Sequence, residues 1–394
     1  MNIAIIGCGY VAESYSKTLG NYPDLKLVGA CDIDTSRLDN FCGHWESRRF
    51  ATVNELLSDP AIEMVLNLTN PRSHYELTRA AIEAGKHVYS EKPLAMTAGK
   101  ARELVELARR KGVYLACAPC SLLGETAQFV WMALRRNAIG KVRLVYANFD
   151  DGMIAPKLSP WLWRNQSGIP WPAKDEFEIG CTYEHAGYIL TWLAAFFGPA
   201  IRMSSFASCI IREKGVAVDL MAPDFTVGCI EYGSGVVARV TCSVVAPKDK
   251  SLTIIGDDGV LVVPNLRSDI CPVYMRSIPS SRLKSAIERR INHLRGALGF
   301  TGLRPDWHLW TKYPAVYGSG RMFASPDKLV DFCRGPAEVA DAIREGRPSR
   351  LSPELGWHIT ELTERLQYPD RFANRSEIES TFDPIEPVHQ VRSA

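Results

Sequence analysis

The chain has 394 residues, of which 46% are hydrophobic and 23% charged, and its formal net charge is +2. This length predicts two or three domains of ordinary size, and the composition is typical of a soluble globular protein. The near-neutral charge gives no indication of a nucleic-acid partner. No window approaches 18 apolar residues, so no transmembrane segment is expected.

The chain has 11 cysteines, an odd number, and many of them lie inside apolar runs. Cys117 and Cys120 form a C-x-x-C pair, but no second pair lies at zinc-site spacing. We therefore expect core thiols and no metal site. Reduced cysteines, and a chain that begins directly with a strand instead of a signal peptide, favour a cytoplasmic location.

The first stretch of interest follows a short apolar run at residues 2–6, which predicts a buried parallel strand. Gly7, Gly9 and Ala12 come next in the pattern G-x-G-x-x-A, and a helix-compatible stretch begins there. A strand, a glycine turn and a helix together aim backbone N–H groups and the positive end of a helix dipole at an anion. The pattern predicts a dinucleotide site, and the alternative is a glycine turn with no ligand.

A second apolar run ends at Asp32, about 20 residues after the glycine turn, where a carboxylate meets ribose hydroxyls. This carboxylate favours NAD, because it accepts from the 2′-hydroxyl and repels a 2′-phosphate. Arg37 and Arg48 lie nearby in the sequence, so NADP stays open.

The first 120 residues alternate strand and helix with short loops, which predicts a doubly wound parallel sheet in a dinucleotide-binding Rossmann domain. The expected strands are residues 2–6, 28–32, 64–68, 86–90 and 113–117, and the expected helices are residues 35–46, 73–84 and 97–110.

The pattern changes after about residue 119, where helices 126–137 and 183–197 flank a strand at 141–149 and an irregular stretch at 153–177. Strands with tight turns follow, at residues 203–212, 225–232, 236–245, 252–256 and 260–263. They predict a large, mostly antiparallel open sheet. The fold class is therefore α/β, with an α+β substrate and oligomerisation domain at residues 121–373.

Three further segments complete the second half. Residues 264–325 are an irregular basic insertion, and residues 336–345 and 353–365 are expected helices. Residues 374–394 form a polar tail that we expect to be loose. An amphipathic basic helix at 282–299 either lies over the core with its charges in solvent, or meets substrate phosphates, a partner subunit or a membrane surface.

Residues 67–94, NLTNPRSHYELTRAAIEAGKHVYSEKPL, resemble the Gfo/Idh/MocA family, the glucose-fructose oxidoreductase and inositol dehydrogenase group. The family pattern is Thr-Pro-x-x-x-His, a helix, and then Gly-Lys-His-Val-x-x-Glu-Lys-Pro. The positions that match are Thr69, His74, Gly85 to Val88 and Glu91-Lys92-Pro93, with Pro71 one place late. In the second half, Trp163-Arg164 is similar to a Trp-Arg element of the family.

The resemblance implies a dehydrogenase or reductase that uses NAD or NADP and acts on sugars, polyols or sugar nucleotides. It also implies a homodimer or homotetramer that pairs through the antiparallel sheet. The residues that it places around the cofactor are Gly7, Gly9, Tyr10, Val11, Asp32, Thr69, Asn70, His74, Glu91, Lys92, Trp163 and Arg164.

Lys92 and His185 are the main catalytic candidates, because hydride transfer at a carbinol carbon moves a proton at the oxygen. Lys92 follows a strand expected to end at the carboxyl edge of the sheet, where α/β folds bind ligands. The alternative is a solvated loop lysine. The seven-residue spacing from His185 to Trp192 places this histidine on the family's catalytic one. Otherwise it is a structural histidine in a helix.

One departure from the family concerns the partner of His185. The family usually carries Asp four residues before this histidine and often a second Asp three residues after it, where this chain has Cys181 and Tyr188. A thiol orients an imidazole poorly. Glu178, Tyr183 or Glu184 then orients the imidazole instead, and Tyr183 is our third catalytic candidate. The alternatives are a different proton route or a loss of activity.

A loop rich in aromatic and amide side chains suits a carbohydrate, because aromatic faces stack on sugar rings and amides bind hydroxyls. Its members are Trp161, Trp163, Trp171, Arg164, Asn165, Gln166 and Lys174. The alternative is a loop anchored in the core by its tryptophans.

Three functions therefore remain open. The first is an oxidoreductase that transfers a hydride between nicotinamide and a carbinol or keto carbon of a sugar derivative. The second is an NAD-dependent enzyme that cleaves a glycosidic bond with no net redox change. The third is a dinucleotide-binding protein without catalysis.

Overall fold

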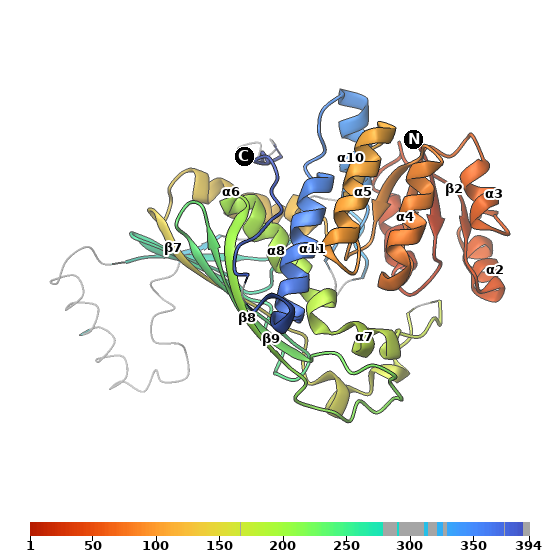
Figure 1. Ribbon diagram of the computed structural model, residues 1–394. Helices are drawn as coiled ribbons and strands as arrows, with labels where there is room; N and C mark the ends of the chain where they lie inside the picture. The colour runs from red at the N-terminus through yellow and green to blue at the C-terminus, as the bar shows by residue number, and fades with distance from the viewer. Residues whose placement is uncertain are drawn as a thin grey trace.

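The computed structural model describes residues 1–165, 167–278, 290, 311–313, 321–325, 329–373 and 375–388. Two β-sheets lie side by side with helices between them (Figure 1). The basic helix expected at residues 282–299 lies, apart from residue 290, outside the described part of the chain.

The amino-terminal sheet has six parallel strands in the order β3-β2-β1-β4-β5-β6. Its central strands are almost wholly buried because helices cover both faces. The predicted doubly wound parallel sheet is confirmed. The strand order reverses direction beside β1, so the carboxyl ends of β1 and β4 form the crevice in which such sheets bind ligands.

The strands of this sheet are β1 (Asn2–Ile6), β2 (Lys26–Cys31), β3 (Arg48–Arg49), β4 (Met64–Asn67), β5 (His87–Ser90) and β6 (Leu115–Cys117). The helices that connect them are α1 (Ala12–Leu19), α2 (Thr35–His44), α3 (Val53–Ser58), α4 (His74–Glu83) and α5 (Ala98–Lys111), with the short turn η1 (Pro71–Ser73).

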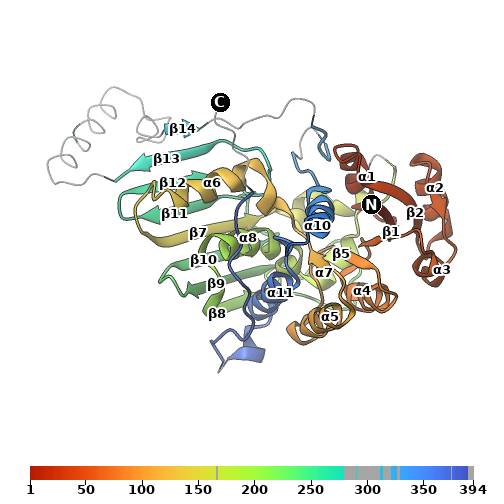
Figure 2. The same cartoon turned by 90° about the horizontal axis from the view of Figure 1, so that it is seen from above.

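The second sheet has eight strands in the order β14-β13-β12-β11-β7-β10-β9-β8. Its neighbouring strands are antiparallel except for β7 and β10, which run parallel. The predicted large, mostly antiparallel sheet is thus confirmed, and Figure 2 shows it with α8 lying across one face.

The strands of the second sheet are β7 (Val142–Asp150), β8 (Ala200–Ser208), β9 (Phe225–Tyr232), β10 (Val237–Ser243), β11 (Leu252–Gly256), β12 (Gly259–Val263), β13 (Val273–Ser277) and β14 (Thr311–Tyr313). The longer helices of this half are α6 (Glu125–Arg135), α7 (Ala173–Ile179), α8 (Cys181–Phe197), α10 (Arg334–Glu345) and α11 (Pro353–Gln367). The short turns are η2 (Ser121–Leu123), η3 (Ile154–Leu158), η4 (Pro160–Leu162) and η6 (Pro369–Phe372).

Helix α8 is the central element that connects the two halves. It is buried from Cys181 to Ala195, because apolar and small residues occur all around it. Helix α11 packs against both α8 and α5, and α10 packs against β5 and β6. The last helices of the chain therefore fix the second sheet against the first. Within the described residues, no helix combines the length and apolar character needed to cross a bilayer.

The expected loose tail is wrong for residues 375–388. The Ser380 N–H donates to the Glu361 carboxylate, and the Val388 N–H donates to the side-chain oxygen of Gln128. Phe382 is buried beside His358. Ile378, Ile385 and Val388 also pack against the hydrophobic core, which composition alone does not reveal.

Candidate active site

A cavity of about 930 Å³ lies between the carboxyl edge of the parallel sheet and the second sheet. From the first half it is lined by the glycine turn, by the end of β4 and by Glu91 and Lys92. From the second half it is lined by Asp151, by residues of α7 and α8 and by the loops that follow β10 and β12. Lys92 and His185 therefore face the same space.

The glycine turn fits a pyrophosphate. Gly7 has a φ of +95°, and a Cβ there would lie 2.8 Å from the carbonyl carbon of Leu68, so no side chain fits. A Cβ on Gly9 would meet nothing within 4 Å, because this residue faces open space. Helix α1 begins just after it with no side-chain cap. Backbone N–H groups and the helix dipole are thus available to an anion at this point.

Asp32 is held rigidly at the end of β2. Its carboxylate accepts from the Cys8 N–H at 2.7 Å and from the Asp34 N–H at 2.8 Å. The Arg37 guanidinium lies 3.8 Å away, whereas Arg48 pairs with a different carboxylate. A carboxylate fixed here favours a free ribose 2′-hydroxyl, with Arg37 as the nearby cation.

The other residues expected around the cofactor divide into two groups. Tyr10, Val11, Thr69, Asn70, Glu91 and Trp163 line the cavity with Gly9 and Lys92. His74 is buried behind it, where its Nδ1 lies 2.6 Å from the Pro93 carbonyl oxygen and its Nε2 lies 2.9 Å from the Thr69 carbonyl oxygen. It therefore ties the β4 loop to the Glu-Lys-Pro segment. Arg164 donates to backbone carbonyls of its own loop instead of lining the cavity.

Two of the three tryptophans in the aromatic loop line the cavity, and the third does not. Trp163 and Trp171 line the cavity with their ring centroids 5.4 Å apart. Trp161 instead packs over Gly215, where no side chain would fit. The loop thus offers two aromatic faces to a ligand, while its third tryptophan anchors it. Gln166 lies outside the described residues.

Lys92 forms an ion pair with Glu184 of α8, and the two side chains are only 14% and 10% exposed. Burial lowers the pKa of Lys92, but the Glu184 carboxylate more than offsets this, so the pKa lies above its ordinary value. Lys92 is therefore an ammonium at neutral pH. The pair joins the edge of the first sheet to the central helix of the second half.

His185 faces a carboxylate that the sequence analysis missed. Its Nε2 lies 3.5 Å from Oδ2 of Asp151, the residue after β7. Burial lowers the pKa of His185 and Asp151 opposes this only in part, so the imidazole is neutral at pH 7. Asp151 also pairs with Lys250. Its interactions with His185, Lys250 and Arg267 hold its pKa well below the ordinary value despite burial. The sequence signal was the Asp-Asp-Gly at the end of an expected strand.

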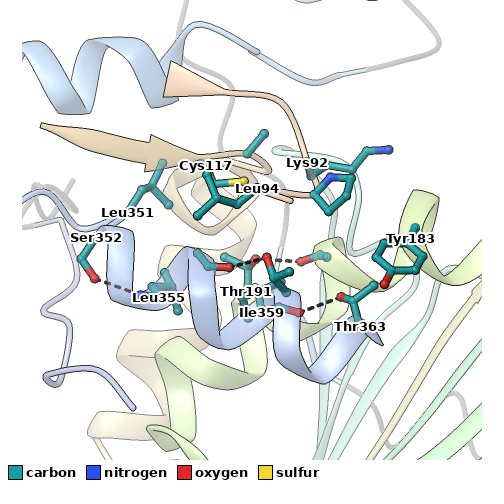
Figure 3. A pocket seen from close by; sticks show the side chains of 15 residues that line it. Lys92, Leu94, Cys117, Tyr183, Thr191, Leu351, Ser352, Leu355, Ile359 and Thr363 are labelled. Carbon is teal, nitrogen blue, oxygen red and sulfur yellow. Dashed lines mark hydrogen bonds between the residues drawn. The ribbon is translucent and has the colours of Figure 1, made fainter. Parts of the chain in front are cut away.

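Cys181, which stands in place of the family's Asp, and two of the expected substitutes, Glu178 and Tyr183, have other partners. Cys181 donates to the Cys242 carbonyl, and burial raises its pKa to about 12, so it stays a thiol. Glu178 accepts from the Asp219 N–H. Tyr183 donates to the Met96 carbonyl at 2.7 Å. Tyr183 lines a separate small cavity of about 20 Å³ between α8 and α11 (Figure 3).

Comparison with known proteins identifies the family. The family described as "Oxidoreductase family, NAD-binding Rossmann fold" matches residues 1–118, and "GFO/IDH/MocA C-terminal domain" matches residues 128–262. The chain belongs to the GFO/IDH/MocA family of oxidoreductases. Residues 1–118 thus form an NAD-binding Rossmann domain, as the glycine turn and the strand order indicate.

Relatives within the GFO/IDH/MocA family are distant. The mouse (Mus musculus) trans-1,2-dihydrobenzene-1,2-diol dehydrogenase is 26% identical over 267 residues, which is 66% of this chain and 74% of that protein. The Danio rerio protein of the same name is 24% identical over 263 residues, 66% of this chain and 73% of its own.

Solved structures of low identity share the fold. The WlbA dehydrogenase from Bordetella pertussis, in complex with NADH and UDP-GlcNAcA, has a TM-score of 0.68 and 16% identity, covering 96% of this chain and 98% of its own. The 3-ketoreductase KijD10 from Actinomadura kijaniata, solved with NADP and TDP-benzene, has a TM-score of 0.69 and 16% identity. The match covers 93% of this chain and 96% of KijD10. Relatives of this fold were thus solved with either dinucleotide.

Replacing Asp32 by Asn tests the preference for NAD. The amide keeps the shape and one acceptor but loses the charge, so we expect the Kd of NADH to rise about tenfold. The Kd of NADPH should stay equal or fall. Both are measured by fluorescence titration, with Asp34→Asn as the control because Asn caps α2 as well as Asp does. Equal weakening of both cofactors would contradict this role of Asp32.

Proposed function

We propose that the protein transfers a hydride between a nicotinamide dinucleotide, preferably NAD, and a carbinol or keto carbon of a sugar or sugar derivative. The observation that carries the proposal is the single cavity that Gly9, Lys92 and His185 share. A nicotinamide bound there supplies the hydride acceptor or donor. The protein supplies the groups that act on the oxygen of the substrate.

Lys92 supplies the positive charge at that oxygen. Its raised pKa keeps it an ammonium, which polarises a carbonyl during reduction and stabilises an alkoxide during oxidation. Glu184 holds the ammonium in place at the domain boundary. A lysine so strongly paired is a poor proton acceptor, so a second group has to take the proton.

His185 is that second group in the proposal. Its imidazole is neutral and lines the cavity, and the Asp151 carboxylate stabilises the imidazolium that forms when the proton arrives. In this proposal, Asp151 replaces the carboxylate that other family members usually carry four residues before the histidine. A site with this pair retains acid–base chemistry, which speaks against a protein that only binds the dinucleotide.

The substrate class rests on the walls of the cavity. Trp163 and Trp171 offer aromatic faces of the kind that stack on sugar rings. The structurally similar WlbA dehydrogenase was solved with a sugar nucleotide. We therefore expect a cyclic, hydroxyl-bearing substrate.

Lys92→Met tests the proposed function. Wild-type protein is screened with NAD and NADP against sugars, polyols and sugar nucleotides, and NADH formation is followed by absorbance. The variant should lose roughly a hundredfold or more of kcat, because the developing oxyanion loses its cation. The Kd of NADH should change far less than kcat.

The control for that experiment is Lys100→Met, which removes an exposed lysine of α5 and should leave turnover intact. Normal turnover by Lys92→Met would contradict the role of this lysine. Release of free sugar without net NADH formation by wild type would instead favour glycoside cleavage over oxidation.

Asp151→Asn tests the proton acceptor. Removing the negative charge lowers the pKa of His185 further, so the acidic limb of the pH–kcat profile for alcohol oxidation should move to lower pH by about one unit. We also expect kcat to fall roughly tenfold or more. The control is Asp257→Asn, which alters an exposed carboxylate on the second sheet. An unmoved acidic limb would show that His185 is not the acceptor.

We propose in addition that the protein pairs through the open face of its second sheet. Leu144, Tyr146, Phe206 and Val237 are exposed, and the strand register places them on the face away from α8. Burial of such a face between two copies removes apolar area from water.

Sedimentation velocity tests this pairing. Wild type should sediment as a dimer or tetramer, and Phe206→Glu should yield monomers because a charge cannot be buried there without a partner. The control is Leu220→Glu, which alters an exposed leucine outside the sheet. A monomeric wild-type protein would contradict the proposal.

A further inference from the structure

Three cations lie on one wall of the large cavity and have no part in the hydride transfer proposed above. Lys248 and Lys250 belong to the loop between β10 and β11, and Arg267 belongs to the loop after β12. The backbones of the two loops are paired. The Leu266 N–H donates to the Lys250 carbonyl at 2.9 Å, and Lys250 and Asn265 form an isolated parallel β-bridge. The fold thus holds like charges together.

Their charges are only partly balanced by the described residues. Asp151 pairs with Lys250. Across the described residues, no carboxylate lies within ion-pair distance of Arg267 or Lys248, and the buried Nε of Arg267 has no hydrogen-bond partner. Glu176 also lines the cavity, where burial and the neighbouring Glu184 charge raise its pKa well above the ordinary value. Among the described residues, Asp151 is thus the carboxylate that pairs with this wall, through Lys250.

The pKa of Lys250 reflects this excess of positive charge. Burial and the neighbouring Arg267 lower it to about 8, even though Asp151 opposes the shift. Like charges held together at partial burial are costly unless an anion joins them.

Two aromatic side chains, Phe149 and Tyr188, connect two of these cations with His185. The Phe149 ring stacks on His185 and Tyr188, with centroids 4.8 Å and 5.2 Å apart, and Lys250 Nζ lies 4.6 Å from its centre. The Arg267 guanidinium lies over the Tyr188 ring at 5.2 Å. An anion held by the cations would therefore sit at a fixed position relative to His185.

We propose that Arg267 and Lys250, with Lys248 at the rim, form a subsite for an oxyanion of the substrate. A guanidinium edge with a free Nε binds a carboxylate or a phosphate in two parallel hydrogen bonds. The inference rests on the proposed function and narrows it: the substrate is an acidic or phosphorylated sugar derivative, in which the anion aligns the reacting carbon with Lys92 and His185. Neutral sugars and polyols are poor substrates.

The test measures binding of matched probes to the full-length protein saturated with NADH, by calorimetry. The probes are glucose, glucuronate, glucose 6-phosphate and glucose 1-phosphate. At least one anion should bind about tenfold or more tightly than glucose, the gain typical of charge-assisted hydrogen bonds. Tighter binding of glucuronate assigns a carboxylate, and tighter binding of a phosphate assigns a phosphorylated sugar.

Arg267→Gln should abolish this preference while the Kd of NADH stays unchanged. Lys248→Gln alters an exposed side chain that the fold does not need, and it should weaken anion binding severalfold. The control is Arg202→Gln, which removes an exposed arginine paired with Glu231 on the second sheet.

Two results would overturn the subsite. In the first, no anion binds more tightly than glucose. In the second, the variants weaken NADH instead of the probes, which would assign the cations to the cofactor's phosphates. Because the readout is binding, its outcome is separate from turnover: a clear anion preference without any hydride transfer would contradict the proposed function and leave the subsite standing.

Discussion

The ion pair between Lys92 and Glu184 connects the two halves of the active site. Lys92 stands at the carboxyl edge of the parallel sheet, and Glu184 projects from the buried helix of the second half. Two charges this far from water need each other, because loss of either one leaves the other without compensation. The pair therefore fixes where the dinucleotide domain meets the second sheet. The cavity, the glycine turn and the acid–base groups all take their relative positions from that meeting point.

The electrostatics of the cavity divide the chemical roles between neighbouring residues. Glu184 keeps Lys92 charged, whereas burial keeps His185 neutral. In the proposed mechanism Lys92 therefore supplies a permanent cation, and His185, which follows Glu184 on α8, supplies the proton acceptor. Asp151 compensates charge on the opposite side, where it faces both His185 and Lys250. Two lysine–carboxylate pairs thus stand around a single space, and only one of them belongs to the family's sequence pattern.

The sequence predicted the dinucleotide domain well because its signals are local. Short apolar runs, a glycine turn and amphipathic helices each occupy a few consecutive residues, and short loops leave one arrangement of parallel strands. The order of the large sheet was less accessible, since β7 pairs with β10 and β11 across long stretches of chain. Such pairings depend on tertiary packing that no local pattern records.

The same reason explains which site residues the sequence missed. The candidate partners of His185 lay on its own helix and just before it, where the spacing along the chain can be read. The carboxylate comes instead from the end of β7, brought there by strand register. Arg267 and Lys250 likewise meet only because two loops are bonded together. The tail after residue 375 was misjudged because packing of a few apolar side chains outweighs a polar composition.

The most direct test of the central claim is a crystal structure of the protein with NADH bound. We expect the pyrophosphate at Gly9 and the nicotinamide inside the large cavity, with room for a substrate carbon at about 3–3.5 Å from its C4 and within hydrogen-bond reach of Lys92 and His185. A nicotinamide that lies outside this cavity, or that is separated from Lys92 by protein, would contradict the account.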